Sequence, residues 1–294
     1  MNTFTTYVTT WGTDPLVQVQ DMAAKGVLQT NTIVVLAFAS FNFDSTDYIP
    51  GFGNISIDKV QQIAGVVHAA NSKLSLSVGG ATYPFAGSDL YTRPGDLAAN
   101  IYAVLQKCGF DGVDFDIEDY YGSVPSNFAT QAASLINTLR SLDANLYITL
   151  TTAAQAWSTG CYQQSLINMT IGSLNAWQPM EYDIWIDSSS TYPQQIEWDI
   201  NFYMNTWDIP AAKMILGLMP GLDDMGRNLT LQDALNLTNF AVSTGLRGVM
   251  TWDADTDSQG IDGNAPYAYS LGIESMLSKN INKRVHGMKR RRTK

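Results

Sequence analysis

Short runs of β-branched and aromatic residues alternate along the chain with longer amphipathic windows. The runs are rich in Val, Ile, Thr and Tyr, which favour strands; they span 3–11, 32–38, 73–80, 111–118, 146–154, 174–183, 213–219 and 247–253. Windows with helix-like apolar spacing lie between them, at 56–72, 95–109, 126–142 and 229–245. Several windows begin at Ser and end at Gly or Asn, as helix caps do.

Eight strands alternating with helices predict a single (β/α)8 TIM barrel without an obvious α+β insertion. The rival architecture is an open doubly wound sheet, but no Gly-rich phosphate-binding loop follows the first strand. No repeat or linker divides the chain before its end. We therefore expect one domain, the barrel, over residues 1–282.

The composition is that of a globular chain, with 45% hydrophobic and 15% charged residues among 294. Its longest apolar runs are about ten residues, whereas roughly 20 are needed to cross a bilayer, so we expect no membrane span. The start, MNTFTTYVTTWGT, lacks the basic and apolar regions of a signal peptide. The two cysteines have neither the number nor the spacing of a disulfide framework or metal site.

Charge is divided unevenly along the chain. Seven of the 17 basic residues lie in residues 283–294, which leaves ten basic against 27 acidic residues and about −17 for the rest. An acidic body repels polyanions, so we expect no nucleic-acid surface on the fold. The basic segment 283–294 is expected to be a flexible tail; a localisation signal and a contact to an anionic partner are the alternatives.

The fourth predicted strand, DGVDFDIE, places carboxylates where a barrel interior would lie. Side chains alternate along a strand, so Asp114, Asp116 and Glu118 share one face and the intervening apolar residues share the other. The apolar face fits the surrounding helices, and the acids then point into the barrel. Glu118 comes last, at the carboxyl end, where barrel active sites are built.

Three carboxylates so close together at low dielectric cannot all ionise cheaply, so at least one is expected to hold a proton near neutral pH. Such a carboxylic acid can protonate a leaving group. A metal site is the alternative, but the two histidines, His68 and His286, are remote in the sequence and no second acidic cluster has ligand spacing. We expect neither metal nor cofactor.

These motifs resemble glycoside hydrolase family 18, the chitinases and their relatives. The family signature D-x-x-D-x-D-x-E is met by Asp111, Asp114, Asp116 and Glu118. Three further family elements follow the same chain order; they are SVGG at 77–80, MEYD at 180–183 and the strand-ending Trp252. The resemblance covers about residues 4 to 280 and excludes the basic tail.

The resemblance implies a retaining mechanism in which the substrate's own N-acetyl group is the nucleophile, an exception to the two-carboxylate scheme. Glu118 would be the general acid and later activate water. Asp116 would orient the acetamide, with Asp114 as its proton-sharing partner. Tyr182 would hydrogen-bond the acetamide oxygen, and Trp252 would lie beneath the reacting sugar.

Further residues are candidates for substrate binding. Met180 and Asp183 belong to the MEYD element, although Met180 equally suits packing. Tyr7, Trp11 and Phe38 lie at the ends of the first two strands and either line the cleft or fill the barrel mouth. Gly80 either lets the chain approach the sugar or permits a tight turn.

Other aromatic residues could extend the cleft as stacking platforms or be exposed loop residues; these are Tyr120, Tyr121 and Trp157. Asp111 has the wrong parity for the inward face and is expected to support the start of the strand.

The expected activity is endo-cleavage of β-1,4-linked N-acetylglucosamine polymers by a monomeric enzyme. The alternatives are an endo-β-N-acetylglucosaminidase acting on N-glycans and an inactive, lectin-like barrel. The four intact signature positions favour catalysis, and the missing insertion predicts a shallow cleft suited to endo action. The substrate class indicates extracellular work, which stands in tension with the absence of a signal peptide; the compartment stays open.

Overall fold

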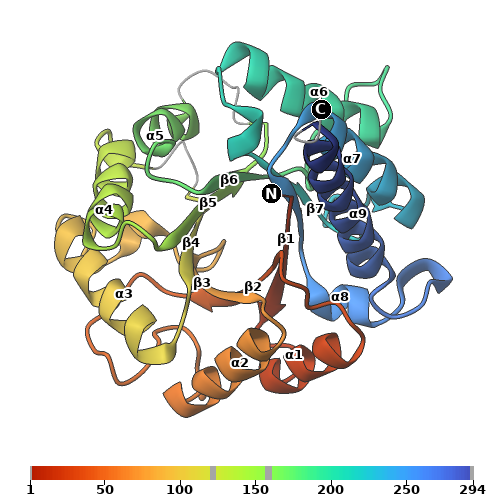
Figure 1. The fold of residues 1–294 in the computed structure, drawn as a ribbon. Helices are drawn as coiled ribbons and strands as arrows, with labels where there is room; N and C mark the ends of the chain where they lie inside the picture. Colours follow the sequence, from red (N-terminus) through yellow and green to blue (C-terminus); the bar gives the residue numbers. More distant parts are fainter. Residues whose placement is uncertain (1, 120–123, 156–160, 292–294) are drawn as a thin grey trace.

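The computed structural model describes residues 2–119, 124–155 and 161–291. Parallel strands close into a barrel in the order β1-β10-β7-β6-β5-β4-β3-β2, with helices around it (Figure 1). The barrel strands are β1 (Thr3–Thr9), β2 (Thr32–Ala39), β3 (Lys73–Gly79), β4 (Gly112–Ile117), β5 (Tyr147–Ala153), β6 (Ala176–Met180), β7 (Ile215–Leu218) and β10 (Gly248–Thr251). The (β/α)8 barrel is confirmed, and each barrel strand lies within its predicted run except β2, which extends one residue beyond it to Ala39.

The α-helices of the described chain are α1 (Pro15–Ala24), α2 (Ile57–Ala69), α3 (Pro94–Cys108), α4 (Phe128–Leu142), α5 (Tyr162–Thr170), α6 (Tyr192–Thr206), α7 (Leu231–Thr244), α8 (Ala254–Ser258) and α9 (Ala268–Arg291). Short 3-10 helices are η1 (Phe85–Gly87), η2 (Ala211–Lys213) and η3 (Ile261–Gly263). The proposed boundary at residue 282 falls inside α9, and residues 292–294 lie outside the described residues.

The helix ends follow the sequence signals. Ser56 caps α2 by accepting a hydrogen bond from the Lys59 backbone N–H, and Thr230 caps α7 in the same way. Gly109 and Gly245 end α3 and α7 with φ values of 79° and 82°, a left-handed conformation that glycine adopts at little cost.

A small hairpin is the addition that the strand pattern did not predict. Strands β8 (Gly221–Leu222) and β9 (Asn228–Leu229) pair antiparallel between β7 and α7. Each has only two residues, too few to show an alternating pattern. The hairpin is not an α+β domain, so the prediction of a single barrel stands.

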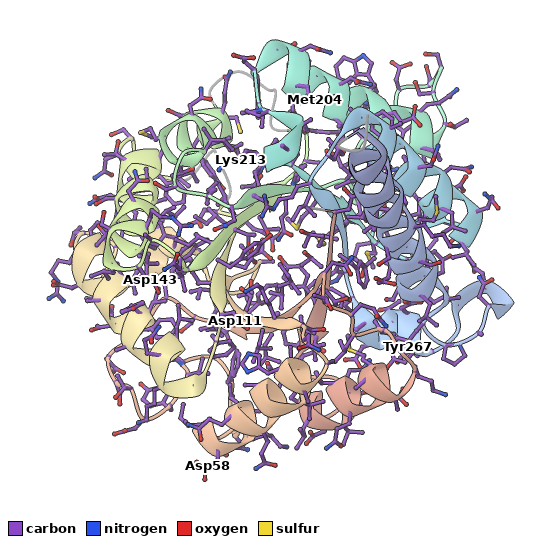
Figure 2. All side chains as sticks on the ribbon, viewed as in Figure 1. Asp58, Asp111, Asp143, Met204, Lys213 and Tyr267 are labelled. Carbon is purple, nitrogen blue, oxygen red and sulfur yellow. The ribbon has the colours of Figure 1, made fainter. Side chains whose placement is uncertain are left out.

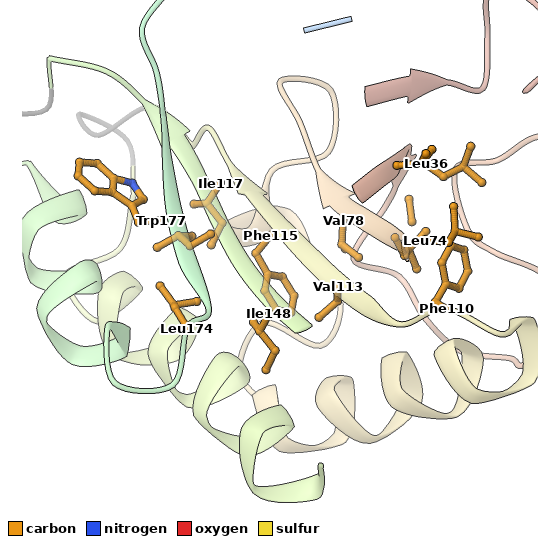
Figure 3. Packing of buried hydrophobic residues seen from close by; sticks show 14 of the residues in the cluster. Leu36, Leu74, Val78, Phe110, Val113, Phe115, Ile117, Ile148, Leu174 and Trp177 are labelled. Atoms are coloured by element: carbon orange, nitrogen blue, oxygen red, sulfur yellow. The ribbon is translucent and has the colours of Figure 1, made fainter. Parts of the chain in front are cut away.

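The position of β4 fixes the orientation of the acidic side chains. It pairs in parallel with β3 and β5, with Ser77 opposite Asp114 on one side and Thr151 opposite Asp116 on the other. Val113, Phe115 and Ile117 are buried on the outward face, among the helices (Figure 3). Asp114 and Asp116 therefore point into the barrel, as predicted.

Asp111 lies near the start of β4, where Figure 2 labels it. Its Oδ2 accepts a hydrogen bond from the Leu74 backbone N–H at 2.9 Å and lies 2.9 Å from His68 Nε2. These contacts join β4 to β3 and α2, which agrees with the predicted supporting role. Within the described residues, no helix has the length and apolar character needed to span a membrane.

Candidate active site

A cavity of about 460 Å³ opens at the carboxyl ends of the barrel strands. Asp116 and Glu118 reach it from β4 and the residues after it, Met180 and Tyr182 from the end of β6 and the residues after it, and Trp252 from the position after β10. Five residues predicted from separate parts of the sequence thus line one cavity. Its volume is in the range of small-ligand sites.

The lining includes predicted and unpredicted residues. Asp183 belongs to it as expected, and so do Phe38 and Trp11, for which the sequence left filling of the barrel mouth as the alternative. The residues that sequence reasoning missed are Gly51, Ala81, Thr82, Tyr83 and Asp224. All of these lie in loops beyond strand ends, where no alternating pattern shows which way a side chain points.

Aromatic rings form one wall of the cavity. The rings of Phe38 and Trp252 stack with centroids 5.4 Å apart and planes 10° from parallel. Trp11 stacks on Phe38 at 5.8 Å and has 62% of its surface exposed. A flat, partly exposed aromatic wall presents the surface that the C–H face of a pyranose ring can cover.

Asp114 lies beneath the cavity and is fully buried. Its two oxygens accept hydrogen bonds from donors on four other strands. The donors are Tyr7 Oη (2.8 Å), Ser77 Oγ (2.7 Å), Thr149 Oγ1 (2.6 Å), Thr151 Oγ1 (2.8 Å) and Gln178 Nε2 (3.3 Å). An ionised carboxylate can only accept, so this donor shell fits a buried negative charge.

The pKa values of Asp116 and Glu118 are both raised above their usual ranges. Burial, and then the charges of Glu118 and Asp114, raise the pKa of Asp116 well above its usual range. Burial also raises the pKa of Glu118, partly offset by a hydrogen bond with the Ala81 backbone, and Asp183 adds to the increase. The two carboxyls therefore hold a proton to higher pH than isolated carboxyls would.

One oxygen of Asp116 is left available. Asp116 is 3% exposed, and its Oδ1 is buried without a hydrogen-bond partner among the described residues. A buried acceptor without a partner is costly in a folded protein. Such an acceptor beside an open cavity fits a donor brought by a ligand.

Tyr182 supplies a phenol to the same cavity. Burial, and then the charges of Asp116 and Glu118, raise the pKa of its hydroxyl well above the usual value. Tyr182 consequently keeps its proton and can donate a hydrogen bond. Asp183 follows with a φ of 54°, and its Oδ1 accepts a hydrogen bond from the Met225 backbone N–H, which ties this loop to the β8–β9 hairpin.

Two residues that were expected to bind substrate, Tyr7 and Gly80, do not line the cavity. Tyr7 is 1% exposed and lies outside the cavity lining, because its hydroxyl turns down to Asp114. Gly80 is also outside the lining; its φ is 77°, and a Cβ there would come within 2.6 Å of the Phe38 ring. Gly80 therefore makes room for the aromatic wall, and Tyr7 supports the carboxylates from below.

The donor shell of Asp114 was also missed. Ser77, Thr149, Thr151 and Gln178 lie at inward-facing positions of β3, β5 and β6. Polar residues alternate with apolar ones in LSLSVGG and ITLTTA, and this alternation indicates polar side chains on the inward face of each strand. Polar groups on inward faces of neighbouring strands could have been assigned to the nearest carboxylate.

The structure bears only in part on the remaining expectations, which concern three further aromatic residues, metal binding and Cys108. Tyr120, Tyr121 and Trp157 lie outside the described residues. Within the described chain, no group of three or more His, Cys, Asp or Glu side chains has the arrangement needed to hold a metal ion. Cys108 is fully buried, as a structural cysteine would be.

A carboxylate pair, a phenol and an aromatic wall at the carboxyl ends of a (β/α)8 barrel are an arrangement that suits a glycoside hydrolase. The family described as "Glycosyl hydrolases family 18" matches residues 3–234. The chain belongs to this family, as its motifs indicated. No curated protein matches it.

Solved structures share the fold. The catalytic domain of a chitinase from Pyrococcus furiosus has 16% sequence identity and a TM-score of 0.72, with 95% of each chain covered. A Group IV chitinase from Ostrinia furnacalis has 16% identity and a TM-score of 0.73, over 95% of this chain and 100% of that one. A GH18 chitinase from Pseudoalteromonas aurantia has 18% identity and a TM-score of 0.71, over 94% and 99%. At these identities the likeness concerns the fold.

Proposed function

We propose that the protein is an endo-acting, retaining hydrolase of β-1,4-linked N-acetylglucosamine polymers, and that the substrate's acetamide is its nucleophile. The observation that carries the proposal is the carboxyl pair at the cavity. Glu118 lines the cavity with a raised pKa, and Asp116 beside it has a buried oxygen without a described partner. The first can donate a proton, and the second can accept one hydrogen bond from a ligand.

Each side chain then has one role. Glu118 protonates the glycosidic oxygen and later removes a proton from the attacking water. Asp116 accepts the acetamide N–H, which turns the acetamide oxygen toward the anomeric carbon, and its negative charge stabilises the positive charge that develops on the ring. Tyr182 donates to the acetamide oxygen, and Trp252 lies against the apolar face of the sugar.

Asp114 has a role different from proton sharing. Its oxygens are already occupied by five donors other than Asp116. Its charge nevertheless raises the pKa of Asp116. Asp114 therefore acts on the site by its electrostatic field, from a position fixed by the barrel interior.

Endo cleavage is supported by the architecture around the cavity. Between β6 and β7 the described chain has only α6 and η2, with no inserted domain to close the cavity over a chain end. Chitinases among the structural neighbours agree with the substrate class. These features favour access to the middle of long chains.

The test is incubation with N-acetylglucosamine oligomers, deacetylated chitosan and an N-glycoprotein, followed by mass analysis of the products. Shorter N-acetylated oligomers are expected, with inhibition by a thiazoline mimic of the cyclised intermediate. Efficient cleavage of the deacetylated chain would contradict the acetamide mechanism. Release of N-glycans would favour the endo-β-N-acetylglucosaminidase, and binding without products the lectin-like barrel.

A further inference from the structure

A second cavity, of about 420 Å³, lies on the segment between β6 and the middle of α6. Its lining shares no residue with the catalytic cavity. Two tryptophans border it, Trp185 with 57% and Trp198 with 53% of their surfaces exposed. Large apolar side chains normally avoid water, so two exposed tryptophans at one hollow call for a binding partner.

Both tryptophans are held by their surroundings, Trp185 through its backbone and Trp198 through its ring. The backbone of Trp185 makes two hydrogen bonds with the Gln155 side chain, its N–H to Oε1 at 2.8 Å and its carbonyl from Nε2 at 2.5 Å. Trp198 stacks on Phe202 with centroids 5.5 Å apart and planes at 22°. Because this order exists before a ligand arrives, binding would cost little conformational entropy.

Polar groups complete the cavity. Asp187, Ser189, Ser190 and Gln195 line it between the two rings in the sequence. The Asp187 backbone N–H donates to Gln195 Oε1 at 3.2 Å, which ties the loop to α6. The tryptophan rings can contact an apolar face of a ligand, and the hydroxyl, amide and carboxylate groups beside them can bind its hydroxyl groups. The cavity therefore suits a ligand that has both.

We infer that Trp185 and Trp198 form a second carbohydrate site, which holds a β-1,4-linked N-acetylglucosamine chain outside the catalytic cavity. Trp185 follows Asp183 of the catalytic cavity by two residues, a backbone span of at most about 7 Å. A polymer that leaves the catalytic cavity across Asp183 would meet the Trp185 ring. This inference rests on the proposed function.

Competing occupants fit less well. The acidic protein body, with a net charge of −10 for the chain, and Asp187 in the lining disfavour nucleic acids and other polyanions. A stable dimer interface buries roughly 800 Å² per partner with an apolar centre. Here Gln195 and two serines accompany the rings in the hollow. A neutral sugar chain matches both the charge and the size.

The experiment removes both rings in two backgrounds. Trp185→Ala/Trp198→Ala is made in the active protein and in Glu118→Gln, so that binding is measured without hydrolysis. Leu142→Ala is the matched control, because Leu142 is 45% exposed at the end of α4, the opposite end of the barrel from the cavity. The readouts are adsorption to insoluble chitin and hydrolysis of insoluble chitin and of a soluble N-acetylglucosamine tetramer.

The expected result is a loss of roughly tenfold in adsorption and in hydrolysis of the insoluble polymer, with tetramer kcat/KM changed less than about twofold. Leu142→Ala should match its parent. Unchanged adsorption, or an equal loss on both substrates, would overturn the inference. So would sedimentation showing that the parent is a dimer and the double variant a monomer.

The tetramer assay separates the two proposals. If the parent protein does not cleave the tetramer, the proposed function fails. Adsorption of Glu118→Gln, with and without Trp185→Ala/Trp198→Ala, still tests the second site. If the tetramer is cleaved and the double variant adsorbs like its parent, the second site alone fails.

Discussion

The Tyr7 hydroxyl donates a 2.8 Å hydrogen bond to Asp114 Oδ2, across the interior of the barrel from β1 to β4. The same hydroxyl lies 3.0 Å from Thr151 Oγ1, itself a donor to Asp114. Tyr7 is thus a buried part of the shell that fixes the carboxylate below the catalytic cavity. Tyr7 therefore supports the site from below, whereas the residues that line the cavity above it can contact a substrate.

Tyr7→Phe removes that donor and preserves the ring. A hydrogen bond to a buried charge is worth about 1.5–3 kcal/mol, so the free energy of unfolding should fall by about that amount. Four donors still hold Asp114, so we expect kcat to fall by roughly tenfold or less and KM for a short oligomer to stay within about twofold. Urea unfolding and steady-state kinetics measure both.

Tyr269→Phe is the matched control, since the buried Tyr269 hydroxyl donates to the Leu229 carbonyl outside the barrel interior. It should lower stability without changing kcat. A KM increase of tenfold or more in Tyr7→Phe, with kcat unchanged, would instead place Tyr7 in contact with the substrate.

Asp116→Asn tests the coupling of the two cavity carboxyls. In the native pair, a negative charge on one carboxyl opposes ionisation of the other, so the last proton leaves at higher pH. Removing the Asp116 charge should lower the pKa that governs the alkaline limb of kcat/KM and move the optimum toward acid. Turnover should fall by roughly 10²-fold or more.

The control is Asp224→Asn, which removes a charge at the exposed rim of the same cavity. Solvent screens that charge, so the alkaline limb should move little. If the limb of Asp116→Asn stays where the wild-type limb lies, the carboxyls are not coupled and this account of β4 is wrong.

The burial of Glu181 predicts that the free energy of unfolding depends on pH, independently of catalysis. It is fully buried, and burial, followed by the charge and hydrogen bond of Asp199, raises its pKa well above the usual value. The folded state therefore binds a proton that the unfolded state releases above about pH 4.3, so stability falls as pH rises. Glu181→Gln removes this loss and should become stabilising relative to wild type between about pH 4 and 7, with a slope difference of at most about 1.4 kcal/mol per pH unit.

Urea unfolding at several pH values measures the difference. Glu197→Gln, on the same helix as Asp199 but partly exposed, is the control and should run parallel to wild type. Parallel curves for Glu181→Gln and wild type would show that Glu181 does not keep its proton in the folded state.

The fold and the acidic face of β4 were predictable because they depend on alternation within one strand. Val113 and Phe115 face outward and Asp114 and Asp116 inward by parity alone. Phe38, Trp252 and Tyr182 could be placed because each lies at or just beyond a strand end, where the barrel directs side chains to one cavity.

Other features depend on contacts between distant segments. The depth of Tyr7 follows from the donors that Asp114 needs, and the role of Gly80 follows from the Phe38 ring that covers it. Neither relation is visible in a local pattern. Loop residues such as Tyr83 and Asp224 lack periodicity altogether, so their position in the cavity required the structure.

The most direct test of the central claim is hydrolysis of an N-acetylglucosamine tetramer by Glu118→Gln, with binding of the same oligomer measured in parallel. Glutamine keeps the shape of the side chain and removes the transferable proton. We expect turnover to fall to less than a few per cent of wild type, with the dissociation constant and the unfolding midpoint close to those of the parent. A folded Glu118→Gln protein that binds the tetramer and still cleaves it at a tenth of the wild-type rate or faster would contradict the account.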